Sequence, residues 1–167
     1  MSSFTLTERQ QTWLFFAVAL VILAAGIGLR DPWPADEPRF ALVAKQMFES
    51  GNWLIPHRGS ELYSDKPPLF MAMQAFFYTL TGQWRIAFLL PSLLAGMGML
   101  WLVYDLGRRL WNPRAGLYAA AALLCTLQFV YQVKRAQIDP AVCFFITLAN
   151  YGLLRHFLLG PHWRMYW

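Results

Sequence analysis

Long apolar runs separated by short polar segments are the main pattern along the chain. A helix that crosses a membrane needs about 20 mostly apolar residues, and four stretches with few or no charges approach that length. The fourth continues past Arg155 and His156 to Gly160. The pattern predicts four membrane-spanning helices, at residues 13–29, 86–106, 115–133 and 140–159.

The first run also has to be compared with a secretory signal peptide. Its 17 apolar residues exceed the about 7–15 that are typical of a signal peptide, and Glu8-Arg9 before it carry no net positive charge. We therefore expect an uncleaved membrane anchor.

A fifth, shorter run does not fit a full crossing. Leu69–Leu80 has 12 residues, including Gln74 and Thr79, and such a run is more often re-entrant or interfacial. The loop between the second and third spans carries Arg108, Arg109 and Arg114, which places it on the cytoplasmic side. Residues 30–85 then form one extracytoplasmic loop. A full crossing by the fifth run would turn the arginines outwards, so we expect a re-entrant helix.

The outer loop contains a predicted amphipathic helix. Its start is marked by Asp36-Glu37-Pro38, with Glu37 as the expected cap because proline suits the first helical position. Its end is marked by Gly51-Asn52. The apolar positions have the three-and-four spacing of one helical face. They are Phe40, Val43, Ala44, Met47 and Phe48.

Composition supports a membrane protein. Apolar residues make up 57% of the chain, aromatic residues 17% and charged residues only 14%, against about 25% charged in soluble domains. This excludes a disordered chain, a disulfide-rich secreted module and an ordinary cytosolic enzyme. The net charge of +5 is explained by basic cytoplasmic loops. The basic stripe of a nucleic-acid-binding protein is missing from the sequence.

The acidic residues are distributed unevenly across the predicted membrane. Seven of the nine lie on the outer side, and three groups combine them with basic residues or with each other. Each group has a simple structural explanation, because carboxylates stabilise helix N-termini and basic side chains extend to the membrane surface. Their position on one face favours a polar site instead. The groups are Asp36-Glu37, Asp65-Lys66-Pro67-Pro68, and Lys134-Arg135 with Asp139.

These residue types fit chemistry on a phosphate-bearing lipid. Lysine and arginine neutralise phosphate oxygens and support a phosphate leaving group. A carboxylate acts as general base, orients an acceptor or binds a divalent cation that bridges a phosphate. The sequence therefore predicts transfer of a group from a lipid phosphate at headgroup depth.

The same motifs resemble those of a known family. Ala35–Phe40 after the first span and Tyr63–Leu69 before the fifth run resemble the polyprenyl-phosphate-sugar-dependent glycosyltransferases, which are GT-C-type membrane enzymes. This family includes the aminoarabinose transferases that modify lipid A and the protein O-mannosyltransferases. Arg108–Gly116 and Arg135–Pro140 also fit, and the resemblance extends from about Trp13 to Leu159.

The resemblance implies a role for several residues. Asp36 matches a catalytic or acceptor-positioning acid, with Glu37 beside it, and Asp139 matches the acid of the second outer loop. Lys66 matches the lysine that contacts the carrier phosphate, and Arg135 is a further expected phosphate contact. The implied metal ligand is Asp65, at an acidic position, often Glu, that can bind a divalent metal cation.

The resemblance also implies an all-α fold, substrates and a location. The chain would be the N-terminal part, residues 1–167, of a bacterial inner-membrane enzyme whose site faces the periplasm. It would move a sugar, 4-amino-4-deoxy-L-arabinose or a hexose, from a polyprenyl phosphate to lipid A, another glycolipid or a protein. Family members are several hundred residues long. Two alternatives stay open: a non-catalytic membrane subunit that binds a lipid or a partner, and a fragment of a transporter or flippase.

Overall fold

The computed structural model describes residues 6–161 and shows an almost entirely helical chain. One small antiparallel hairpin interrupts the helices, with His57 opposite Leu62 and Arg58 opposite Glu61. The all-α fold predicted from the apolar runs is confirmed. The elements are α1 (Glu8–Ala24), α2 (Asp36–Ser50), β1 (His57–Arg58), β2 (Glu61–Leu62), α3 (Leu69–Thr81), α4 (Trp84–Ala87), α5 (Leu90–Leu110), α6 (Pro113–Leu124), α7 (Leu127–Val133) and α8 (Ile138–Leu159).

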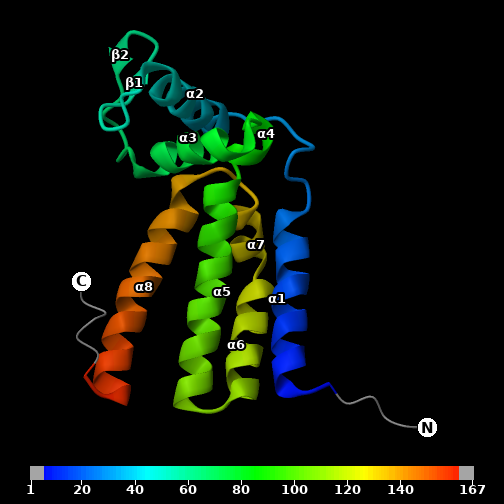
Figure 1. The fold of residues 1–167 in the computed structure, drawn as a ribbon. Helices are drawn as coiled ribbons and strands as arrows, with labels where there is room; N and C mark the ends of the chain where they lie inside the picture. Colours follow the sequence, from blue (N-terminus) through cyan, green and yellow to red (C-terminus); the bar gives the residue numbers. More distant parts are fainter. Residues whose placement is uncertain (1–5, 162–167) are drawn as a thin grey trace.

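The helices form two layers (Figure 1). α1, α5, α6 and α8 stand side by side as a bundle, whereas α2, α3 and α4 lie across one end of it. α1 begins and α8 ends at the opposite end, where α5 also passes into α6. The acidic groups of the predicted outer loop and the basic loop at Arg108–Arg114 therefore lie at opposite ends of the bundle, as the topology prediction requires.

Two described helices have the length and composition to cross a membrane. They are Trp84–Leu110, which joins α4 and α5, and Ile138–Leu159. α6 and α7 qualify as a third span only if the bent pair is taken as one, because they meet at an angle of 71°. The predicted continuous span 115–133 is therefore wrong in its shape. The helix breaks at Cys125-Thr126, and Lys134 follows the short second segment.

The first predicted span, residues 13–29, differs from the structure in its bounds. α1 has 17 residues, begins at Glu8 and ends at Ala24. Gly26 and Gly28 follow with φ of 95° and 81°, in the left-handed region that ends a right-handed helix. Glycine permits this turn, which redirects the chain from the bundle towards the layer above it.

α2 and α3 pack face to face through the predicted apolar stripe. Phe40, Val43, Ala44 and Met47 are buried as expected, but Phe48 is 39% exposed. The layer shares its core with the beginning of α8. The buried members of this core are Phe40, Val43, Ala44, Met47, Tyr63, Phe70, Met71, Ala75 and Ala141.

α3 matches the fifth apolar run and does not cross the bundle. It lies across the bundle end in Figure 1, outside the bundle itself. Its polar residue Gln74 is fully buried and donates a hydrogen bond to the Phe88 carbonyl at 2.9 Å. This bond attaches α3 to the segment that leads into α5.

The predicted cap of α2 is wrong. The helix begins at Asp36 with Ala35 as its cap residue, so Glu37 lies inside the first turn and Pro38 is the third helical residue. Proline is tolerated there because the first backbone N–H groups of a helix have no partner within it. In this register the side chain of Glu37 is buried instead of capping the helix.

The Glu37 hub, formed by Glu37 and its hydrogen-bond donors, joins three segments beneath the upper layer. Arg30 donates to both carboxylate oxygens of Glu37, at 2.6 and 3.0 Å. The backbone N–H groups of Trp33 and Ala136 donate at 2.7 and 2.8 Å. Arg30 also donates to the Lys134 carbonyl at 2.9 Å. The segment after α1, the beginning of α2 and the linker between α7 and α8 are thereby held together.

Glu37 is fully buried but remains a carboxylate. Burial alone raises the pKa of Glu37, but the hydrogen bonds from Arg30, Trp33 and Ala136 outweigh it and hold the pKa below its ordinary value of 4.5. The buried charge is therefore fully compensated, which is the condition under which a buried ion pair persists.

We predict that Glu37→Gln destabilises the fold strongly. The substitution leaves Arg30 without a countercharge and turns one carboxylate oxygen into an NH₂ group, so one of the two backbone N–H groups loses its acceptor, at a cost of about 3 kcal/mol. Thermal unfolding in detergent measures the change. Glu49→Gln is the matched control on the same helix, since its partner Lys45 is 54% exposed, and it should change stability by no more than about 0.5 kcal/mol. Equal effects of both substitutions would contradict the role of the hub.

The same hub predicts a pH dependence of stability. Because the folded pKa of Glu37 lies below the unfolded value, its stabilisation is complete well above pH 4.5 and is lost as pH falls through the folded pKa. The stability difference between the wild type and Glu37→Gln should therefore narrow on acidification. Unfolding of both proteins across a pH series provides the measurement, and a constant difference would argue against an ionised Glu37.

Candidate functional site

Asp36 lies at the surface of the upper layer, beside the buried Glu37. Its side chain is 45% exposed and accepts a hydrogen bond from Arg39 at 2.6 Å, one turn along α2. Glu37 is fully buried and accepts four hydrogen bonds. Solvent can therefore reach the carboxylate of Asp36 but not that of Glu37. The geometry gives Glu37 a structural task, and its catalytic role stays a prediction.

Tyr63 connects the first two predicted groups of site residues. Its side chain is buried in the core shared by α2, α3 and α8. Burial raises the pKa of Tyr63, and the negative charges of Asp65 and Asp36 add to that effect while Arg39 opposes it. The charges of Asp36 and Asp65 thus both act on the Tyr63 phenol. This shared electrostatic effect relates the first two groups of the predicted site.

Two polar atoms at this place have no protein partner within residues 6–161. They are Tyr63 Oη and Arg39 Nε, both buried. Buried polar atoms without a partner are rare in native proteins, and each calls for a water, an ion or a ligand group. A phenol and a guanidinium N–H beside Asp36 supply donors for an oxygen-rich ligand.

Lys66 lies in the loop that leads into α3 and is exposed. The loop lines a cavity of about 430 Å³ together with Tyr63, Asp65 and the two prolines. Pro68 caps α3, so Lys66 lies just before the helix instead of in its first turn. Its ammonium group has no hydrogen bond or ion pair to the described part of the chain, which leaves its charge available to a ligand.

Asp139 and Arg135 belong to one hydrogen-bonded chain between α7 and α8. In the orientation that its neighbours require, the Gln137 amide accepts from Arg135 Nη2 at 3.0 Å and donates to Asp139 at 3.2 Å. Gln132 donates to Asp139 at 3.5 Å. Asp139 lies in the first turn of α8, where a carboxylate also stabilises the helix dipole.

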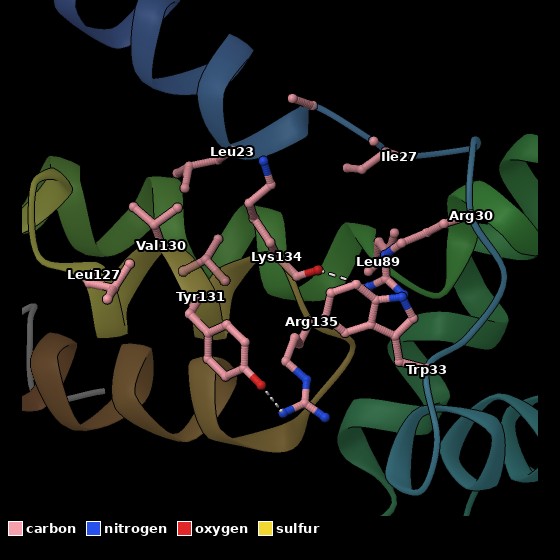
Figure 2. Close-up of a pocket in the computed structure, with 13 residues that line it drawn as sticks. Leu23, Ile27, Arg30, Trp33, Leu89, Leu127, Val130, Tyr131, Lys134 and Arg135 are labelled. Atoms are coloured by element: carbon pink, nitrogen blue, oxygen red, sulfur yellow. Dashed lines mark hydrogen bonds between the residues drawn. The ribbon is translucent and has the colours of Figure 1, made fainter.

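The third group does not share a cavity with the other two. Arg135 lines a cavity of about 410 Å³ between the end of α1 and α7 (Figure 2). Asp139 lines a separate one of about 320 Å³ on the other side of α7. Lys66 lines neither. All three groups lie at the same end of the bundle, but Lys66 and Arg135 face different spaces.

The residues around Asp65 do not form a metal site. Asp65 is exposed, and among residues 6–161 no three His, Cys, Asp or Glu side chains gather closely enough to hold an ion. A stable divalent site draws on several oxygen ligands. The divalent metal predicted at Asp65 therefore stays a prediction, and the chemistry of the site is derived without it.

Sequence reasoning missed the residues that organise the site. Arg30 closes the first apolar run and holds Glu37, but a basic residue at a membrane edge also has an ordinary explanation. Arg39 and Tyr63 lie within the motifs Ala35–Phe40 and Tyr63–Leu69, but the sequence alone assigns them no role. The only available signal was their position inside those motifs, because burial and missing partners become visible only in three dimensions.

Comparisons with known proteins agree on the class of protein. The family model described as dolichyl-phosphate-mannose-protein mannosyltransferase matches residues 65–166. An undecaprenyl phosphate-alpha-4-amino-4-deoxy-L-arabinose arabinosyl transferase of Proteus mirabilis is 30% identical over 154 residues, covering 89% of this chain and 27% of the relative. A transferase of the same name from Pseudomonas aeruginosa is also 30% identical, over 87% of this chain and 27% of its own length.

The fold agrees as well. The crystal structure of ArnT from Cupriavidus metallidurans bound to undecaprenyl phosphate superposes with a TM-score of 0.79 at 26% identity, over 86% of this chain and 27% of that one. The chain thus spans about a quarter of the length of the relatives it matches. The resemblance found in the motifs is confirmed: the chain belongs to the dolichyl-phosphate-mannose-protein mannosyltransferase family of GT-C-type membrane glycosyltransferases.

Proposed function

We propose that this chain forms the donor-binding part of a glycosyltransferase that takes its sugar from a polyprenyl phosphate. The acceptor is lipid A or another envelope molecule, and the reaction takes place on the periplasmic side of a bacterial inner membrane. The observation that carries the proposal is the position of Lys66. A cation that forms no ion pair with residues 6–161 lines a cavity together with Tyr63, whose phenol also feels the charge of Asp36, at the end of an apolar helix bundle.

Lys66 and Asp36 have different tasks in this reaction. The bond between the sugar C1 and the carrier phosphate oxygen breaks, and the phosphate leaves with the electron pair. Lys66 stabilises the negative charge of that leaving group. A new bond forms between C1 and the acceptor oxygen. Asp36 takes the proton if the acceptor is a hydroxyl and orients the acceptor if it is an ionised phosphate.

The neighbours of Asp36 support its role. The ion pair with Arg39 fixes the carboxylate, and the Glu37 hub fixes the beginning of α2 from below. Asp139 does not line the Lys66 cavity. We assign it a positioning role, because its hydrogen bond with Gln137 holds the linker between α7 and α8. The sugar itself, including 4-amino-4-deoxy-L-arabinose, is proposed from the relatives named above.

The second candidate function is a lipid-binding subunit without transferase activity. It is favoured by the separation of the charged groups, because Lys66, Arg135 and Asp139 line three different cavities. A donor-dependent assay separates the two functions. The chain, purified in detergent, is supplied with radiolabelled polyprenyl-phosphate sugar and envelope acceptors. Labelled acceptor supports the transferase, whereas donor binding without transfer supports the subunit.

We predict that Lys66→Ala weakens the use of the donor. A charged hydrogen bond to phosphate contributes about 1.5–3 kcal/mol, so donor binding should fall about tenfold to a hundredfold. Binding of undecaprenyl phosphate to the purified chain is the measurement. Lys45→Ala on α2 is the control, an exposed lysine away from the cavity. If Lys66→Ala bound the carrier as the wild type does, Lys66 would lie outside the donor site.

Asp36→Asn should separate chemistry from binding. Loss of a general base lowers the rate of transfer to a hydroxyl acceptor by about 10²–10⁴, while the carrier phosphate is still held by Lys66. The transfer rate and carrier binding are measured side by side. Asp31→Asn is the matched control, because Asp31 is 74% exposed and pairs only with the exposed Arg85 in the described part of the chain. An unchanged transfer rate in Asp36→Asn would remove Asp36 from the reaction.

A further inference from the structure

The cavity of about 410 Å³ between α1 and α7 combines apolar walls with basic groups (Figure 2). Leu23 and Ile27 line it on the side of α1, and Leu127 and Val130 line it on the side of α7. Its basic residues come from the loop after α1 and from the end of α7. They are Arg30, Lys134 and Arg135.

Only one of the three cations is neutralised. Arg30 is paired with Glu37. Lys134 donates to the Ile22 carbonyl at 3.1 Å, and Arg135 donates to the Tyr131 hydroxyl at 3.0 Å. Neither Lys134 nor Arg135 has a carboxylate within 4.0 Å in the described part of the chain. The cavity therefore carries an excess of two positive charges.

The surroundings of Arg135 point to a missing ligand group. Arg135 Nε is buried and has no hydrogen-bond partner among residues 6–161. A buried donor of this kind is costly unless an acceptor reaches it. Tyr131 lies against the guanidinium at 5.2 Å from its ring centre, which fixes the plane of that group. A phosphate satisfies such a guanidinium better than water does.

The walls identify the rest of the ligand. Leu127 lines the cavity and is 85% exposed, and Tyr131 beside it is 46% exposed. Apolar side chains that are exposed at the end of a membrane bundle are surfaces for acyl chains. Two cations that have no carboxylate partner in the described part of the chain, beside such walls, match a lipid whose headgroup carries phosphate.

We propose that this cavity binds the phosphate of a second membrane lipid, distinct from the polyprenyl carrier. The Lys66 cavity and the α1–α7 cavity share no lining residue. Arg135 therefore serves this second lipid and not the carrier. The lipid is the acceptor of the transferred sugar, and this last statement rests on the proposed function.

The hub explains how two lipid sites are kept in register. Glu37 binds the N–H of Ala136, next to Arg135, and Asp36 precedes Glu37 on α2. The catalytic carboxylate and the second cavity are thus attached to the same buried residue. An acceptor held by Lys134 and Arg135 approaches the layer from the side of α1 and α7.

Native mass spectrometry of the detergent-purified chain tests the proposal. The probes are phosphatidic acid, which has a terminal phosphate and acyl chains, phosphatidylcholine, inorganic phosphate and undecaprenyl phosphate. We expect phosphatidic acid to bind together with undecaprenyl phosphate. In Lys134→Gln/Arg135→Gln, phosphatidic acid binding should fall on the order of tenfold to a hundredfold, with undecaprenyl phosphate binding unchanged.

Two controls make the result specific. Lys45→Gln/Arg85→Gln removes the same charge from a different cavity and should leave phosphatidic acid binding intact. Lys134→Arg/Arg135→Lys keeps both charges and should retain most of the binding, which excludes a folding defect.

Three outcomes would overturn the second site. Phosphatidic acid binding could be insensitive to the double glutamine variant, the two lipids could exclude each other, or inorganic phosphate could bind as well as the lipid does. The proposed function is judged separately by Lys66→Ala. If Lys66→Ala loses carrier binding, the proposed transferase function is supported even when the proposal of a second lipid site is wrong.

Discussion

The ion pair between Glu37 and Arg30 is the interaction on which the upper layer depends. It compensates a fully buried carboxylate and, through two backbone N–H groups, joins the segment after α1, the beginning of α2 and the linker before α8. The outer side of α2 and α3 is not covered by other described helices in Figure 1 and adds little packing energy. The hydrogen bonds of the Glu37 hub fix the position of this layer on the bundle. Every candidate site residue except those of the Lys66 loop lies within a few positions of this hub.

The division of labour between the two layers follows from this constraint. The bundle is apolar, and α5 and α6 approach so closely at Gly107 and Gly116 that a Cβ on either glycine would meet backbone atoms of the other helix. The upper layer is polar at its edges and presents Asp36 and Lys66 around the buried Tyr63. This division suits the proposed function, in which lipid substrates reach the charged groups of the upper layer from the side of the bundle.

Much of this organisation could be predicted from hydrophobic periodicity. The long runs identified α5 and α8, and the stripe from Phe40 to Met47 identified the buried face of α2. The bend between α6 and α7 could not be predicted, because Cys125-Thr126 has no proline or glycine to mark it. The opposite orientations of Asp36 and Glu37 depend on a two-residue shift of the helix start, from a cap at Glu37 to a cap at Ala35. The separation of Lys66 from Arg135 is a tertiary property that no local pattern contains.

The most direct test of the central claim, that Lys66 holds the carrier phosphate, is photo-crosslinking. A polyprenyl phosphate with a photoreactive group next to its phosphate would be irradiated with the purified chain, and the labelled peptide would be located by mass spectrometry. We predict adducts in residues 54–56 or 62–68, which line the Lys66 cavity. Adducts confined to residues 127–135 would show that the carrier occupies the cavity between α1 and α7 and would contradict the assignment.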